Sequence, residues 1–423
     1  VEGGNINIAI TADPQDINPL YVVDQTSFDV MQALYSPFFE IVHGEMYYGN
    51  GLCENVTSND DATEFTLTLK DGLMWDDGEP ITADDVVFTM QVLVDENQNV
   101  PYSSYGFIDG QPVQAEKVDD RTVKLILPES SAGFLGGLSQ VYCIPKHIYE
   151  GVENIGDSDL NNNPVGCGPF KFDEYKSGEY IRVVKNDKWF NDVNLDSITF
   201  RIIKDANSAN AALASGDLDA RLISADEYQT VSGYSNVNIY AYNSGRVNAM
   251  FLNQSTPALQ DVRVRQAIAY GLNKQELCNF AFLSEEYADP AYSILTPDTL
   301  YYTELDNVMD NDPEKATELL TEAGQQNLTL RLMYVSTDKT EESQAIYIQS
   351  TLANIGINIE LVPTDESTFK NKTKDPTCTD YDLVLSYYTL GEEPSLSADM
   401  ITSDRRSNRS HVQDTDLDAL WTE

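Results

Sequence analysis

Helical and extended patterns alternate in the C-terminal half of the chain, and this order restricts the folds open to it. Residues 345–355 place apolar side chains at helical spacing and end at Gly356, while residues 328–335 and 357–362 have the apolar character of strands. A strand, a helix and a second strand in this order form a right-handed crossover between parallel strands. The run 381–388 suits a further buried strand. The pattern therefore predicts an α/β architecture.

Two helix starts are marked by capping residues. Thr82 is placed as an N-cap, and Asp85, three residues later, can complete a capping box. The pair Asp312-Pro313 has the N-cap and first-turn residues of another helix, which we expect to end at Gly324. Both helices are thus predicted with defined ends.

The first 175 residues have a different character. Residues 65–69 and 122–127 alternate in polarity, and Asp77-Gly78 is a tight turn signal, so this part is predicted to contain strands and hairpins. We assign Trp75 and this turn to structure and not to ligand contact. Shifts in composition near residues 44, 166 and 250 are the candidate domain boundaries.

The charge of the chain excludes several partners. Its 26 Lys and Arg against 69 Asp and Glu give a net charge of −43. Such a surface repels nucleic acid and anionic lipid, so neither is expected as the main partner. No run approaches eighteen apolar residues, so we expect no membrane span. The chain begins without the basic and apolar segments of a signal peptide, and we expect that any such peptide has been removed.

Residues with catalytic or metal-binding chemistry are scattered. The five cysteines and three histidines have no metal-ligand spacing, so we expect no metal and no cofactor. A disulfide between Cys278 and Cys378 is one alternative, but the first expectation is that the cysteines are buried free thiols. Cys167, between two glycines, is better explained by a tight turn than by a nucleophile. We therefore predict no catalytic residue and no enzymatic activity.

Six motifs occur in order along the chain. They are residues 65–88 (FTLTLKDGLMWDDGEPITADDVVF), 163–172 (NPVGCGPFKF), 211–219 (AALASGDLD), 261–270 (DVRVRQAIAY), 312–324 and 352–357. Together they resemble the family 5 extracellular solute-binding proteins, which include the peptide and nickel receptors of ABC importers.

The resemblance implies a two-lobed periplasmic-binding-protein (Venus flytrap) fold with an extra domain in lobe I. Domain I is expected at 1–43 plus 167–250, domain II, the extra domain, at 44–166, and domain III at 251–423. The family chain ends by crossing back to the first lobe, and we expect that this C-terminal return segment is missing here.

The resemblance also implies a function and a set of binding residues. We expect an extracellular receptor, a cell-surface lipoprotein or a periplasmic protein, that works as a monomer. It would capture a small solute between its lobes and deliver it to the permease subunits of an ABC importer. The expected ligand-binding residues are Tyr21, Val23, Asp24, Gln25, Tyr102, Tyr105, Asn253, Tyr387, Tyr388, Leu390, Glu392 and Glu393.

The class of ligand stays open at this point. An oligopeptide is the first expectation, but the aspartate that peptide receptors of this family use for the ammonium group corresponds to Leu390 here. Glu392 or Glu393 can replace it, and Lys339 can bind the carboxylate. The alternatives are a sugar, a modified peptide or a metal chelate in the same fold. Two alternatives come from other classes of protein. One is a cleft hydrolase such as a glycosidase, and the other is an adhesin or a sensor subunit.

Overall fold

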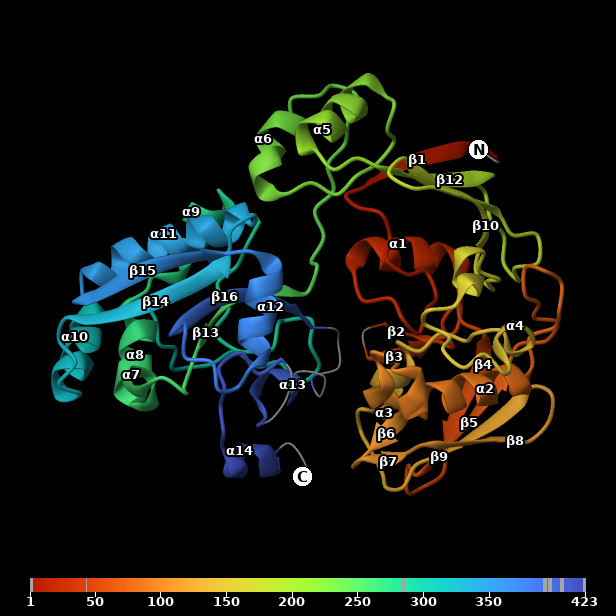
Figure 1. Cartoon of the computed structure of the whole chain (residues 1–423), viewed down its shortest axis with the longest axis horizontal. Helices are drawn as coiled ribbons and strands as arrows, with labels where there is room; N and C mark the ends of the chain where they lie inside the picture. The colour runs from red at the N-terminus through yellow and green to blue at the C-terminus, as the bar shows by residue number, and fades with distance from the viewer. Residues whose placement is uncertain are drawn as a thin grey trace. The chain divides into compact units, whose positions relative to one another are not determined.

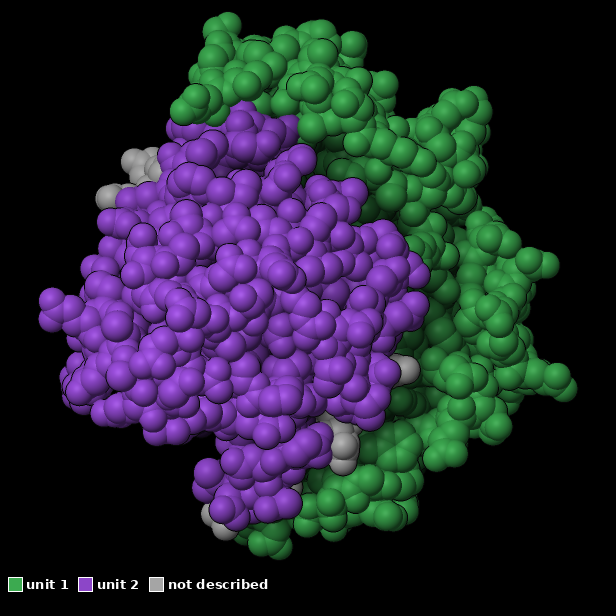
Figure 2. Space-filling view, turned by 60° about the vertical axis from the view of Figure 1, so that its left-hand side comes forward, with its two compact units in different colours: residues 1–223, 229–238 green, residues 224–228, 239–423 purple. Residues whose placement is uncertain are grey.

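The chain forms two compact units in the computed structural model, which describes residues 3–42, 44–283, 287–390, 394, 398–403 and 407–420 (Figure 1). Unit 1 comprises Val1–Ile223 and Gln229–Asn238, and unit 2 comprises Ser224–Tyr228 and Ile239–Glu423, as coloured in Figure 2. In no described helix is there a stretch long and apolar enough to cross a bilayer.

The boundary between the units differs from the expected one at residue 250. Strand β13 (Arg246–Leu252) lies on the C-terminal side of the division, because it pairs along its whole length with β16 (Leu383–Thr389). A boundary at 250 would cut this strand. The composition shift in the sequence therefore falls inside a strand of unit 2 and not between the units.

Unit 1 contains two four-stranded sheets. The first has the order β1 (Asn5–Ile10), β12 (Ser197–Ile202), β11 (Tyr180–Lys185) and β10 (Phe170–Lys176). Only the β1–β12 pair is parallel, and it joins segments that lie almost 200 residues apart. The second sheet is antiparallel, with the order β4 (Cys53–Ser58), β5 (Glu64–Leu69), β9 (Thr122–Ile126) and β8 (Gln114–Lys117).

Short elements complete the N-terminal half. The helices are α1 (Gln25–Leu34), α2 (Ala83–Val94), α3 (Phe134–Leu138), α4 (Lys146–Tyr149), α5 (Ala206–Ser215) and α6 (Tyr228–Val231). The small hairpins are β2 (Glu40–Val42) with β3 (Glu45–Tyr47), and β6 (Phe107–Ile108) with β7 (Gln111–Pro112). The predicted capping box of α2 is confirmed, since both hydrogen bonds between Thr82 and Asp85 are formed.

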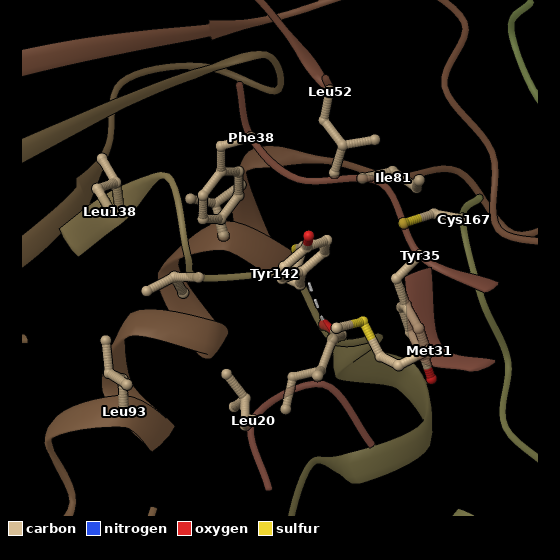
Figure 3. Packing of buried hydrophobic residues seen from close by; sticks show 14 of the residues in the cluster. Leu20, Met31, Tyr35, Phe38, Leu52, Ile81, Leu93, Leu138, Tyr142 and Cys167 are labelled. Atoms are coloured by element: carbon tan, nitrogen blue, oxygen red, sulfur yellow. Dashed lines mark hydrogen bonds between the residues drawn. The ribbon is translucent and has the colours of Figure 1, made fainter. Parts of the chain in front are cut away.

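The core of unit 1 explains two of the sequence motifs. Trp75 is fully buried, and its backbone N–H donates to the Glu79 carbonyl across the turn in which Gly78 has a φ of +97°. Cys167 is buried near Tyr35 (Figure 3), and its Sγ accepts from the Ser36 N–H at 3.5 Å. Burial raises the pKa of this thiol to about 12, which opposes the thiolate that a nucleophile needs. Both motifs are therefore structural.

The described residues of unit 2 form a sheet with the order β13, β16, β14 (Leu328–Val335) and β15 (Ile357–Thr364). Strand β14 is parallel to β15 and β16, and α11 (Lys339–Ala353) joins β14 to β15. The predicted strand–helix–strand unit is confirmed. The predicted helix after Asp312 is also confirmed as α10 (Pro313–Glu322), with Asp312 as N-cap and Gly324 in the left-handed region.

Helices cover both faces of this sheet (Figure 1). On one face, α8 (Val262–Tyr270), α10 and α11 enclose a core of Leu, Ile and Ala side chains, with α9 (Lys274–Phe282) packed on α11. On the other face, α12 (Glu366–Lys374) buries Phe369. The remaining helices are α7 (Pro257–Gln260), α13 (Ala398–Ile401) and α14 (Thr415–Leu420). Cys278 and Cys378 are free thiols and are not bonded to each other.

Candidate functional site

Polar side chains gather at one edge of the unit 2 sheet. Strands β14, β15 and β16 all end there, at Val335, Thr364 and Thr389. Antiparallel β13 begins there, because Arg246 pairs with Thr389. Ligands of open α/β sheets bind outside the carboxyl ends of the strands. This edge is therefore the first place to look for binding residues.

Arg246 is the centre of this polar group. Its Cζ lies 3.7 Å from the centroid of the Tyr387 ring, and its Nε and Nη2 donate to Asn248 Oδ1 at 3.3 and 3.2 Å. The strand register places Asn248 opposite Tyr387, so the three side chains share one face of the sheet. Nη2 also lies 3.7 Å from Asp338 Oδ2. These contacts orient a guanidinium whose side chain remains 37% exposed.

Glu341 lies next to this group and is almost completely buried, at 3% exposure. The Val335 N–H donates to its Oε2 at 2.8 Å. Burial raises the pKa of the carboxyl from 4.5 to about 7, while the Val335 N–H, Arg246 and Arg409 act in the opposite direction. This carboxyl therefore takes up a proton at a much higher pH than an exposed glutamate does.

Asp338 links the edge to helix α11. As its N-cap, the Asp338 carboxylate accepts from the N–H groups of Thr340 and Glu341 at 2.9 and 3.0 Å. Lys339, which the sequence offered as a carboxylate partner, is largely exposed and pairs with Glu342 at 2.7 Å. Of these two cations, Arg246 is the one that several neighbouring side chains orient.

The predicted binding residues of unit 2 have different environments. Tyr387 is 46% exposed and lies under Arg246. Tyr388 points to the other face, where its hydroxyl donates to the Ile294 carbonyl and burial raises its pKa to about 12. Leu390 is buried, and its N–H donates to the Gly245 carbonyl. Glu392 and Glu393 lie outside the described residues.

Asn253 is fully buried, with 0% exposure. Its Nδ2 donates to the carbonyl oxygens of Cys378 and Tyr381 at 2.9 and 3.0 Å, and its Oδ1 accepts from the Ser255 N–H at 3.0 Å. Because donors and acceptor are all used inside unit 2, the amide holds two loops together.

The predicted residues around helix α1 have mostly local partners. Tyr21 is buried, and its hydroxyl donates to the Gln98 carbonyl at 3.1 Å, while burial raises its pKa. Asp24 is the N-cap of α1, and Gln25 donates to Asp29 at 2.7 Å. Val23 is 59% exposed. Of these four, Val23 presents the most open apolar side chain.

Tyr102 and Tyr105 form a stacked pair in unit 1. Their ring centroids lie 5.8 Å apart with an interplanar angle of 10°. Both rings line a cavity of about 60 Å³, which also reaches Phe28 on α1. Burial, and to a smaller extent the Asp24 carboxylate, raise the pKa of Tyr102. The two tyrosines, both expected from the sequence as ligand-binding residues, thus border a small cavity.

The sequence reasoning missed Arg246, Asp338 and Glu341. Arg246 had one usable signal, since it begins a strand that pairs with the end of another, but that pairing is visible only in the fold. Within the described part of the chain, no group of three or more His, Cys, Asp or Glu side chains is arranged to hold a metal ion.

Comparison with known proteins identifies the family. Residues 48–408 match the model of the bacterial extracellular solute-binding proteins, family 5 Middle. The chain is 27% identical to the oligopeptide-binding protein AppA of Bacillus subtilis (strain 168) over 417 residues, which cover 93% of this chain and 75% of that protein. A dipeptide-binding protein of Escherichia coli (strain K12) is 26% identical, over 86% of this chain and 72% of the relative.

Solved structures have the same fold. The ABC transporter substrate-binding protein CtaP of Listeria monocytogenes superposes with a TM-score of 0.95 at 40% identity, covering 100% of this chain and 86% of that one. AppA of Bacillus subtilis in complex with a nonapeptide gives 0.82 at 25% identity, with the same coverage. These matches confirm the predicted α/β fold class and the predicted resemblance. The chain belongs to family 5 of the bacterial extracellular solute-binding proteins.

Proposed function

We propose that this chain is the substrate-binding receptor of an ABC importer, and that its ligand is a peptide with a free carboxylate. The names of similar proteins support a peptide, since they include an oligopeptide-binding and a dipeptide-binding protein and a complex with a nonapeptide. The receptor holds its ligand without cleaving it and passes it to the permease subunits in the membrane.

Arg246 is the observation that carries this proposal. A guanidinium presents paired N–H donors that match the two oxygens of a carboxylate. The Tyr387 ring and Asn248 hold this guanidinium in place, so less conformational entropy is lost when a carboxylate binds. Its contact with Asp338, at 3.7 Å, is longer than a hydrogen bond and leaves donors available for a ligand.

In this chain the ammonium group of such a peptide needs another partner than the aspartate expected in peptide receptors of the family. Leu390 has no charge and is buried. A carboxylate at Glu392 or Glu393 remains the predicted partner. If neither serves, a ligand without an ammonium is favoured, because a desolvated cation without a partner costs several kcal/mol.

Calorimetry with matched peptides tests the proposal. We titrate a defined mixture of short peptides in four forms: free, N-acetylated, C-amidated and doubly blocked. C-amidation should weaken binding tenfold or more in the natural protein and much less in Arg246→Gln, because a charge-assisted pair contributes roughly 1.5–3 kcal/mol. Arg263→Gln is the matched control, since Arg263 is a partly exposed arginine on α8 of unit 2 that pairs with Asp261, the N-cap of that helix.

The outcomes separate the alternatives. Equal affinity of free and C-amidated peptides would remove Arg246 as the carboxylate partner. Absence of binding by any peptide form, with binding of sugars or metal chelates, would replace the peptide by a non-peptide ligand. Mass spectrometry of the recovered peptide should show it unchanged, and a cleaved product would identify a hydrolase instead.

We also propose that the receptor works as a monomer outside the cytoplasmic membrane, either anchored as a lipoprotein or in the periplasm. The family is described as extracellular, which supports the location. Light scattering of the purified protein tests the oligomeric state, and cell fractionation with analysis of the native N-terminus tests the anchor.

A further inference from the structure

We propose that the cavity bordered by Tyr102 and Tyr105 is a side-chain pocket that selects a short aliphatic side chain of the ligand. This inference rests on the proposed function, because it assigns the pocket to a peptide ligand. It goes beyond that function because it states which kind of side chain the receptor selects at one position of the peptide.

The walls of the cavity come from three parts of unit 1. Phe28 and Met31 belong to α1, and Pro19 and Val22 precede that helix. Tyr142 closes another side, and Figure 3 shows its ring near Met31 among the buried residues. Apart from Gln140, the walls are thus formed by aromatic and aliphatic side chains.

The burial of the walls shows which part is the floor. Val22, Met31 and Tyr142 are buried, whereas Phe28, Tyr102 and Tyr105 are half-buried. Gln140, the most polar wall residue, is exposed. The cavity therefore has a buried apolar floor, and the rim with Gln140 is accessible from the surface.

The volume sets the size of the occupant. The volume of the cavity is about 60 Å³. One water needs about 10–15 Å³, so the space takes roughly four to six non-hydrogen atoms. Valine, leucine, isoleucine and methionine side chains have three or four such atoms. The rings of phenylalanine, tyrosine and tryptophan are too large.

The chemistry of the walls excludes charged side chains. The eight wall residues include no Asp, Glu, Lys or Arg. An ionised side chain in the pocket would lose its hydration without gaining a partner, and this is strongly unfavourable. An aliphatic side chain gains from leaving water, at about 0.8 kcal/mol for each buried methylene.

The tyrosine wall is held in position before any ligand binds. Gly137 on α3 lies so close to the Tyr105 ring that an added Cβ would be 3.1 Å from Cδ1. The Tyr102 ring stacks on the other ring of the pair. A wall that is already ordered can reject a side chain that is too large, because little rearrangement is available to admit it.

Position-scanned pentapeptides test the pocket. Each peptide is polyglycine with one Gly, Val, Leu, Phe or Lys at each position in turn, and affinity is measured by competition. In the natural protein, the affinity should depend on the residue at one position of the peptide. Peptides with Leu or Val there should bind about tenfold or more tightly than those with Gly, and also more tightly than those with Phe or Lys. Tyr102→Ala enlarges the cavity and should bring Phe to at least the affinity of Leu at that position.

Two further variants keep the test decisive. Phe28→Ala enlarges the same cavity from α1 and should change the Leu-to-Phe ratio in the same direction, so the test survives if Tyr102→Ala fails to fold. Tyr180→Ala removes a tyrosine that donates to Glu174 on the strand pair β10–β11, and it should leave the profile unchanged.

The possible failures can be told apart. If peptides bind with no preference at any position, or if neither cavity variant changes the Leu-to-Phe ratio, the pocket assignment is wrong while the peptide receptor stands. If no peptide binds to the natural protein, the proposed function itself fails, and this inference fails with it.

Discussion

Replacing Glu341 by glutamine should stabilise unit 2 strongly at alkaline pH and only weakly at acidic pH. Glutamine has the same shape as glutamate and keeps an oxygen to accept from the Val335 N–H. It removes the charge and replaces the second carboxylate oxygen by an NH2 group. The pH dependence of the effect therefore reports the free energy of holding an ionised carboxylate at a site with 3% exposure.

The magnitude follows from the shift in pKa. Burial raises the pKa of Glu341 from 4.5 to about 7 in the folded protein. Because the folded pKa is the higher one, the stability that this group contributes is fully present below pH 4.5. It is lost as the pH rises through 7. At pH 8 the natural protein is then less stable than the glutamine variant by about 3 kcal/mol, and at pH 5 by about 1 kcal/mol.

Hydrogen exchange in increasing urea measures this difference for unit 2 alone. Peptides from β14 and α11 report the free energy of unfolding at pH 5 and pH 8 for both proteins. Glu342→Gln is the control, because Glu342 is a partly exposed neighbour paired with Lys339. It should change stability by no more than about 0.5 kcal/mol at either pH. If Glu341→Gln stabilises equally at both pH values, or at neither, the burial of an ionisable carboxyl is not the cause.

Three further substitutions test the structural assignments. Gly78→Val should lower the unfolding free energy by roughly 1–3 kcal/mol in urea, because residue 78 has a φ of +97°, while the folded fraction binds ligand normally. A folded Gly78→Val protein without binding would place the hairpin in the site. Gly168→Ala should lower the melting temperature, since its Cβ would lie 2.6 Å from the Leu34 backbone, and an unchanged melting temperature would contradict that close packing. Asn253→Ala leaves two carbonyl groups without their donor and should cost roughly 2 kcal/mol in the same urea assay, whereas a neutral effect would show that water replaces the amide.

Local features of the fold were predictable from the sequence because their causes lie within a few residues. The capping box of Thr82 and Asp85, the Asp312-Pro313 helix start and the glycine stops at 324 and 356 depend on neighbouring backbone groups. The strand–helix–strand unit follows from periodicity and from the handedness of crossovers. The family was also predictable, since six motifs in order carry it.

The candidate site depended on the tertiary structure because its members are distant in the sequence. Arg246 reaches Tyr387 only because β13 and β16 pair in one particular register. A shift of one residue would turn these side chains to opposite faces. Glu341 looks like an ordinary residue of a helix, and only packing against the end of β14 buries it and raises its pKa.

Burial also decided which predicted residues remain open to a ligand. Asn253 and Leu390 were both expected from the sequence as ligand-binding residues, but both side chains are buried in the folded chain. The boundary between the units is a similar case, because the pairing of β13 with β16 assigns residues 246–252 to unit 2 regardless of composition. The sequence by itself determined the elements and the family. Register and packing, which join distant residues, determined which side chains can meet a ligand.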